Sequence, residues 1–163
     1  DRHRILVIYY KIASMYFGTG NYETTIDYLN KIINWKVDLR NDLQCYARLL
    51  HLIAHYELGN YQLLEYLAKS VYRFMAKKDN LTVVEEEMFK FLRKSFNVSR
   101  NKMQQELEHF LDKIKGLEKN RFETRAFAYL DIISWVESKV YHKTMGEILQ
   151  EKYKQSKKRV YKS

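Results

Sequence analysis

The sequence predicts an all-α protein, built as a right-handed solenoid of about four antiparallel helix hairpins. Three observations support this fold class. The 163 residues include no proline and only five glycines, which are too few turn-forming residues for a β-sandwich or a β-barrel. Apolar residues recur every three or four positions along almost the whole chain, as they do on one face of a helix. The tripeptide Gly-Asn-Tyr occurs twice, 39 residues apart, in GTGNY and ELGNY.

The first hairpin is expected over residues 3–36. Its first helix carries one apolar stripe, which consists of Ile5, Tyr9, Ile12, Ala13 and Tyr16. Gly18-Thr19-Gly20 interrupts this helix, because glycine readily ends a helix with a positive φ. Asn21 is suited to cap the next helix. The apolar face of that helix consists of Tyr22, Ile26, Leu29, Ile32 and Ile33. Two antiparallel helices joined by a tight turn form a hairpin.

The second hairpin, expected over residues 39–77, repeats this pattern. Its first helix carries two adjacent apolar rows, Leu43, Ala47, Leu50 and Ala54 in one and Leu49, Leu52, Ile53 and Tyr56 in the other. Gly59 ends this helix and Asn60 is placed to cap the next. The second helix carries Tyr61, Leu64, Leu67, Ala68, Val71 and Met75 on one face.

The third and fourth hairpins, expected over residues 82–117 and 120–156, are marked by helix-start motifs. Thr82 to Glu85 and Thr144 to Glu147 both fit the capping box, Thr-x-x-Glu. In the fourth hairpin, one continuous helix is expected to carry Phe122, Ala126, Tyr129, Ile133 and Val136. The four hairpins would form a single domain over residues 1–156, followed by a basic tail over residues 157–163.

A single hairpin cannot bury both of its faces, so neighbouring hairpins must stack, and the result is a solenoid. The chain begins at Asp1 without a methionine, and the segment RILVIYY is apolar from its start. We therefore expect the chain to be a fragment of a longer protein, in which an upstream helix pair covers this segment. If the segment is exposed, it favours self-association through the N-terminal helix.

Composition argues against several classes of protein. Cys45 is the only cysteine, so the chain has no internal disulfide, and nothing indicates a secreted disulfide-stabilised module. The apolar runs are only a few residues long, far shorter than a membrane span. We therefore expect a cytoplasmic protein with no membrane partner.

The net charge of +9 is concentrated at the C-terminus. Residues 152–163 contain no acid and six basic side chains, namely Lys152, Lys154, Lys157, Lys158, Arg159 and Lys162. The rest of the chain is almost balanced. The tail either binds nucleic acid or another acidic partner, with an affinity that falls steeply with salt, or forms a solvated polar end to the solenoid.

No pattern in the sequence indicates catalysis. His51 and His55 have the i, i+4 spacing of zinc ligands, but no third ligand accompanies them, which favours packing or groove-lining roles. Gly18-Thr19-Gly20 follows a helix and lacks the Gly-Lys-Ser/Thr of a phosphate loop. Glu85 to Glu87 suit the positive end of a helix. We expect no enzyme, no cofactor and no metal.

The first two hairpins resemble the tetratricopeptide repeat (TPR) family, whose unit of about 34 residues also joins two helices through a Gly-Asp/Asn-Tyr turn. The matching positions of the first hairpin are Tyr9, Ile12, Ala13, Tyr16, Gly20, Asn21, Tyr22, Thr25, Leu29 and Ile32. The second hairpin matches around AHYELGNYQLLEYLAKSV. The later hairpins resemble the family only in length and periodicity.

This resemblance implies a scaffold that binds a peptide or protein on a concave face lined by the first helix of each hairpin. The implied lining residues are Val7, Tyr10, Ser14 and Phe17 in the first hairpin, and Tyr46, Leu49, Ile53 and Tyr56 in the second. The residues with which some TPR proteins clamp a terminal carboxylate are replaced here by Tyr10, Lys11, Ser14 and Gly18. An aromatic groove for an apolar or extended segment is therefore expected, although these aromatic residues would equally fill the space between helices.

Together, these observations predict a non-enzymatic scaffold for protein–protein interaction. The alternative function is the binding of nucleic acid or an acidic partner through the basic tail.

Overall fold

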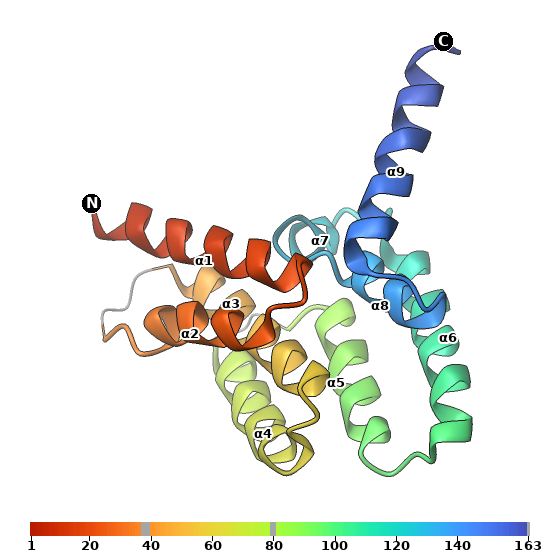
Figure 1. The fold of residues 1–163 in the computed structure, drawn as a ribbon. Helices are drawn as coiled ribbons and strands as arrows, with labels where there is room; N and C mark the ends of the chain where they lie inside the picture. The colour runs from red at the N-terminus through yellow and green to blue at the C-terminus, as the bar shows by residue number, and fades with distance from the viewer. Residues whose placement is uncertain (37–39, 79–80, 163) are drawn as a thin grey trace.

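The computed structural model describes residues 1–36, 40–78 and 81–162, all of which lie in helices or in the turns that join them (Figure 1). The predicted boundary positions 39 and 163 lie outside this range. The described residues form nine helices and no strand, which confirms the all-α class. The helices are α1 (Arg2–Gly18), α2 (Tyr22–Ile33), α3 (Asn41–Glu57), α4 (Tyr61–Lys77), α5 (Val83–Ser95), α6 (Arg100–Leu117), α7 (Thr124–Tyr129), α8 (Ile132–Val140) and α9 (Met145–Val160).

Both Gly-Asn-Tyr motifs form the turn of a helix pair. Gly20 has a φ of 80° and Gly59 a φ of 74°, a backbone conformation that glycine adopts without strain. The Asn21 side chain accepts a hydrogen bond from the Thr24 N–H at 3.2 Å and so caps α2. Asn60 occupies the same position before α4, but its side chain pairs with the ring of His55 at 3.1 Å and does not cap the helix.

Helix α3 lies at the centre of the molecule and is buried on almost every side. It packs against α2 and α4 and also contacts α1. Twelve of its 17 residues are buried, including polar Gln44, whose side chain donates to the Ile32 carbonyl at 2.7 Å. On the other side of the molecule, α6 packs against both α5 and α8, while α4 and α5 contact each other only slightly.

The fourth predicted hairpin differs from the expectation. The single helix predicted through Phe122 and Val136 is wrong, because the chain breaks at Leu130 and forms two short helices, α7 and α8. Leu130 is extended, and Asp131 starts α8 by accepting a hydrogen bond from the Ser134 N–H at 3.0 Å. Phe122, expected on the buried face, is 78% exposed. The break frees α7 to lie against helices that are distant in the sequence.

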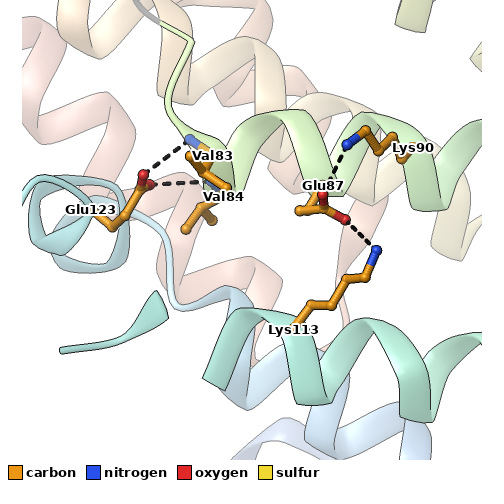
Figure 2. A network of polar contacts seen from close by, with 6 residues as sticks. All are labelled: Val83, Val84, Glu87, Lys90, Lys113 and Glu123. Carbon is orange, nitrogen blue, oxygen red and sulfur yellow. Dashed lines mark hydrogen bonds and ion pairs between the residues drawn. The ribbon is translucent and has the colours of Figure 1, made fainter. Parts of the chain in front are cut away.

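Glu123, just before α7, caps the start of α5 (Figure 2). The residue is only 3% exposed, and its carboxylate accepts hydrogen bonds from the backbone N–H groups of Val83, at 3.0 Å, and Val84, at 3.1 Å. These donors would otherwise lack a partner in the first turn of the helix. One turn further along α5, Glu87 pairs with Lys90 and with Lys113 of α6 (Figure 2). The α7 segment and α6 are thus tied to α5 by separate polar contacts.

Replacing Glu123 with alanine is expected to lower the free energy of unfolding by about 2 kcal/mol, because the part-buried Val83 N–H and the buried Val84 N–H lose their acceptor. Urea denaturation would measure this loss, and Glu118→Ala, at an exposed position nearby, is the matched control. Equal stability of the two variants would show that Glu123 does not hold α7 to α5.

Glu85 lies in the same first turn of α5 and is almost fully buried. Its carboxylate accepts a hydrogen bond from the Thr82 N–H at 2.8 Å. Burial raises the pKa of Glu85 from its ordinary value of 4.5 to about 7, and the negative charge of Glu123 adds to this effect. The folded protein therefore binds a proton at Glu85 more tightly than the unfolded chain does.

Glu85 is expected to stabilise the fold most at acidic pH, below about 4.5, and to lose this contribution as the pH rises through about 7. Glu85→Gln retains an oxygen that can accept from Thr82 but does not ionise. Between pH 5 and 8 the free energy of unfolding of the native protein should therefore fall by roughly 2–3 kcal/mol relative to that of this variant. Denaturant unfolding of both proteins across this pH range tests the difference. Parallel pH profiles would contradict the assignment.

Candidate functional site

The concave-face residues predicted from the sequence lie mostly inside the protein. Val7 and Ser14 are partly buried, and six of the eight are buried, namely Tyr10, Phe17, Tyr46, Leu49, Ile53 and Tyr56. The aromatic side chains that were expected to face a partner instead pack against the protein's own helices. Of these six, only Phe17 borders the large cleft described below, and the packing of the other five keeps them away from it.

Tyr129, at the end of α7, covers part of this inner face. Its ring stacks on Tyr46 with 4.8 Å between the ring centroids and meets Tyr10 edge-on at 6.4 Å. The Tyr10 hydroxyl donates to the Tyr129 carbonyl at 2.8 Å, and Arg40 donates to the Tyr129 hydroxyl at 3.1 Å. Burial raises the pKa of both Tyr10 and Tyr46, so both hydroxyls stay protonated. The α7 segment therefore occupies the place where the sequence predicted a ligand.

An ion pair adds to this attachment. Asp42, at the start of α3, contacts Arg125 of α7 at 3.2 Å and Arg40 at 3.0 Å. Hydrogen bonds from Arg40 lower the pKa of Asp42 to about 2. Ser14, Phe17 and Ile53 still border a small cavity of about 330 Å³ between α1, α3 and the α7–α8 segment.

A much larger cleft, of about 1100 Å³, opens between the α1–α2 turn and the helices α6 and α8. One wall is formed by Phe17, Gly18, Thr19, Gly20 and Tyr22, with Glu57 from the end of α3. The opposite wall is formed by Arg100, Met103, Gln104 and Leu107 of α6, Trp135, Ser138 and Lys139 of α8, and residues 142–146 of the turn into α9. Of the predicted site residues, only Phe17 lies in this cleft.

Glu57 lies at the floor of the cleft and links two side chains of α8. Its carboxylate side chain is only 8% exposed and accepts hydrogen bonds from Trp135 Nε1 at 2.8 Å and from Lys139 Nζ at 3.1 Å. Burial, followed by the charge of Glu57, raises the pKa of Tyr22 to about 12. Tyr56 packs edge-on against Trp135, with ring centroids 5.8 Å apart. The floor is therefore largely apolar, and its one acid is paired with Lys139.

The rim of the cleft is basic. Lys139 is paired with Glu57, and Lys143 is paired with Glu151 at 2.7 Å. Arg100 is exposed and forms no ion pair with any residue that the structure describes. An apolar floor with an unpaired arginine at its edge suits a ligand that is apolar with an acidic group.

The two histidines singled out in the sequence face each other on α3, with ring centroids 4.5 Å apart. Burial, with smaller effects from His55 and Arg48, lowers the pKa of His51 to about 4. Burial also lowers the pKa of His55. Both rings are therefore neutral near pH 7. Within the described ranges, no group of three His, Cys, Asp or Glu side chains lies close enough to hold a metal ion.

Two further surfaces from the sequence analysis are accessible. On α1, the exposed residues Ile8 and Met15 share one side with Ile5 and Ile12, so self-association through this helix stays a prediction. The basic residues of the tail lie on α9 or just beyond it. None of the helices, over the residues described, combines the length and apolarity that a bilayer crossing requires.

The chain matches no protein-family model, no curated protein and no solved structure.

Sequence reasoning missed the cleft because its walls are distant in the sequence. Met103, Leu107 and Trp135 read as ordinary apolar positions of amphipathic helices. The Gly-Asn-Tyr turn was recognised, but its sequence does not show which later helix lies opposite.

Replacing Glu57 with alanine is expected to lower the free energy of unfolding by about 2 kcal/mol, because the Trp135 N–H and the Lys139 ammonium lose their acceptor. Glu57→Gln keeps an acceptor oxygen, so its free energy of unfolding should fall by a smaller amount. Urea denaturation followed by tryptophan fluorescence measures both variants. Glu65→Ala breaks only the exposed pair with Lys69 and should have little effect. A loss no larger than that of the Glu65 variant would refute the role given to Glu57.

Proposed function

We propose that this chain is a non-enzymatic interaction module, in which helix hairpins stack as a short TPR-like helical repeat and bind a segment of another protein. The observation that carries the proposal is the cleft of about 1100 Å³ between the α1–α2 turn and the α6–α8 wall. Its volume exceeds the range of about 300–1000 Å³ that is usual for small-molecule sites. An extended peptide segment fits such a cleft better than a compact metabolite does.

The packing of the helices supports the repeat part of the proposal. Helices α1 to α4 pack in succession, and both turns between paired helices use the same Gly-Asn-Tyr motif. The binding surface, however, differs from the one implied by the family resemblance. The inner faces of α1 and α3 hold the protein's own α7 segment, whereas the cleft offers accessible side chains.

The side chains of the cleft define the ligand. Phe17, Met103 and Leu107 offer apolar and aromatic surface, and methionine adapts to differently shaped partners. Arg100 at the rim would pair with an acidic residue of the ligand. We therefore expect a peptide segment that combines large apolar side chains with at least one carboxylate.

Two glycines allow the cleft to be filled without removing a contact. A Cβ atom at Gly18 would meet nothing within 4 Å, and at Gly146 it would meet only the Thr144 hydroxyl, at 3.9 Å. Neither residue has a positive φ. Gly116 of α6 is equally open but lies outside the cleft, and so provides a matched control.

Peptides should be selected from a random display library on the native protein, and their affinities measured by fluorescence polarisation. Gly18→Leu combined with Gly146→Phe is expected to weaken binding of the selected peptides at least tenfold, because the new side chains occupy the cleft. Gly116→Phe should bind as the native protein does. Arg100→Glu should weaken the binding of acidic peptides more than the binding of peptides without an acidic residue. Full binding by the cleft-filled variant would rule out the cleft as the binding surface.

A further inference from the structure

Within the described ranges, helix α9 packs on the body through its first turns. A capping box joins Thr144 and Glu147, and Ile148 is the only buried residue of the helix. Among the residues that the structure describes, Lys152 makes the last ion pair with the body, since its ammonium lies 2.8 Å from Glu137 and 2.8 Å from the Ser134 hydroxyl. Beyond Lys152 the helix projects away from the other helices (Figure 1).

The positive charges of this region fall into two sets. Near the body, lysines are neutralised by the protein: Lys139 pairs with Glu57, Lys143 with Glu151, and Lys152 with Glu137. Beyond Lys152 no acid follows in the sequence. Four exposed lysines lie there, and none of them forms an ion pair with any residue that the structure describes. They are Lys154, Lys157, Lys158 and Lys162.

These lysines are arranged to act together. Lys154, Lys157 and Lys158 have the i, i+3, i+4 spacing that places side chains on one helical face. Tyr153 and Tyr161 flank them and are 60% and 89% exposed. The Lys157 ammonium lies 4.8 Å from the centre of the Tyr153 ring, so charge and aromatic surface are adjacent. Four like charges kept close together, with no acid among them, favour a polyanionic ligand.

We propose that the end of α9 is an arm that binds single-stranded nucleic acid. The four lysines pair with successive phosphates, and Tyr153 and Tyr161 stack on unpaired bases. This combination of a basic row and exposed aromatic rings distinguishes a single strand from a duplex, whose bases cannot stack on a side chain.

Other anionic partners fit the arm less well. A helix that lies on a membrane needs a broad apolar face rich in Leu, Phe or Trp. A helix that enters the groove of an acidic protein likewise needs a row of large aliphatic anchors. Beyond Lys152 the only aliphatic side chain is Val160. The arm therefore offers charge and aromatic surface but little else to bury.

Four lysine–phosphate contacts on a single strand predict a slope of about 3 for log Kd against log salt concentration. Affinity should therefore fall roughly 50-fold between about 50 and about 200 mM salt.

The experiment uses the whole chain and a fluorescein-labelled oligouridylate of 20 nucleotides, with fluorescence anisotropy as the readout. Lys154, Lys157, Lys158 and Lys162 are changed together to glutamine, which preserves helix propensity. This variant should lose most of the affinity and most of the salt slope. The control removes the same charge elsewhere, at the exposed residues Lys11, Lys36, Lys115 and Lys119. It should retain both the affinity for the oligonucleotide and the salt slope.

The tyrosines are tested separately. Tyr153→Leu with Tyr161→Leu should weaken binding about tenfold and leave the salt slope unchanged, because stacking is lost while phosphate contacts remain. The cleft-filled variant, Gly18→Leu with Gly146→Phe, should bind the oligonucleotide normally, so that the arm and the cleft are judged independently.

Three results would overturn the proposal. The first is equal affinity of the arm variant and the native protein. The second is duplex DNA of the same length binding as tightly as the single strand, with no effect of the tyrosine changes. The third is tighter binding to phosphatidylserine vesicles, or to polyglutamate, than to the oligonucleotide, which would assign the arm to a membrane or an acidic protein.

Discussion

The enclosure of α3 is the constraint on which the rest of the structure depends. Apolar residues occur all round this helix, and a helix of that kind is stable in water only when other helices surround it. Helices α2 and α4 cover two of its sides, and α1 contacts it as well. The remaining surface around Tyr46 is covered by Tyr129 of α7, from much later in the chain. The break before Asp131 allows α7 to reach this position, and α8 then continues along α6.

This enclosure determines which surfaces remain accessible. The inner face of the first two hairpins is filled by the chain itself, so the accessible surfaces lie elsewhere, in the large cleft and on α9. The turn between α8 and α9 contributes to both accessible features, because it lines the large cleft and also forms the base of the projecting arm. The cleft is apolar with most of its charges paired, whereas the four lysines of the arm form no ion pair with any residue that the structure describes. Adjacent surfaces with such different chemistry suit two different ligands.

Local features could be predicted from the sequence, and long-range packing could not. Apolar periodicity, the Gly-Asn-Tyr turns and the Thr144 capping box depend on residues within one or two helical turns, and the structure contains each of them. The break at Leu130 was missed because Ala126, Tyr129 and Ile133 keep helical spacing across it. The tertiary contacts of Tyr129 and the cap at Asp131 outweigh that periodicity.

The cleft depends on α6 and α8 facing a turn from the start of the chain, which no local pattern specifies.

The α7 segment also limits how this architecture can change in evolution. An open solenoid can grow by internal gene duplication, because each repeat touches only its neighbours. Here the Tyr10 hydroxyl meets the carbonyl of a residue 119 positions later, and Glu123 reaches back about 40 positions to cap α5. A repeat duplicated between these partners would separate them, leaving the aromatic inner surface uncovered and the N-terminus of α5 uncapped. The number of hairpins between Tyr10 and Tyr129 is therefore fixed by geometry. In an open repeat array, by contrast, repeats can be gained or lost.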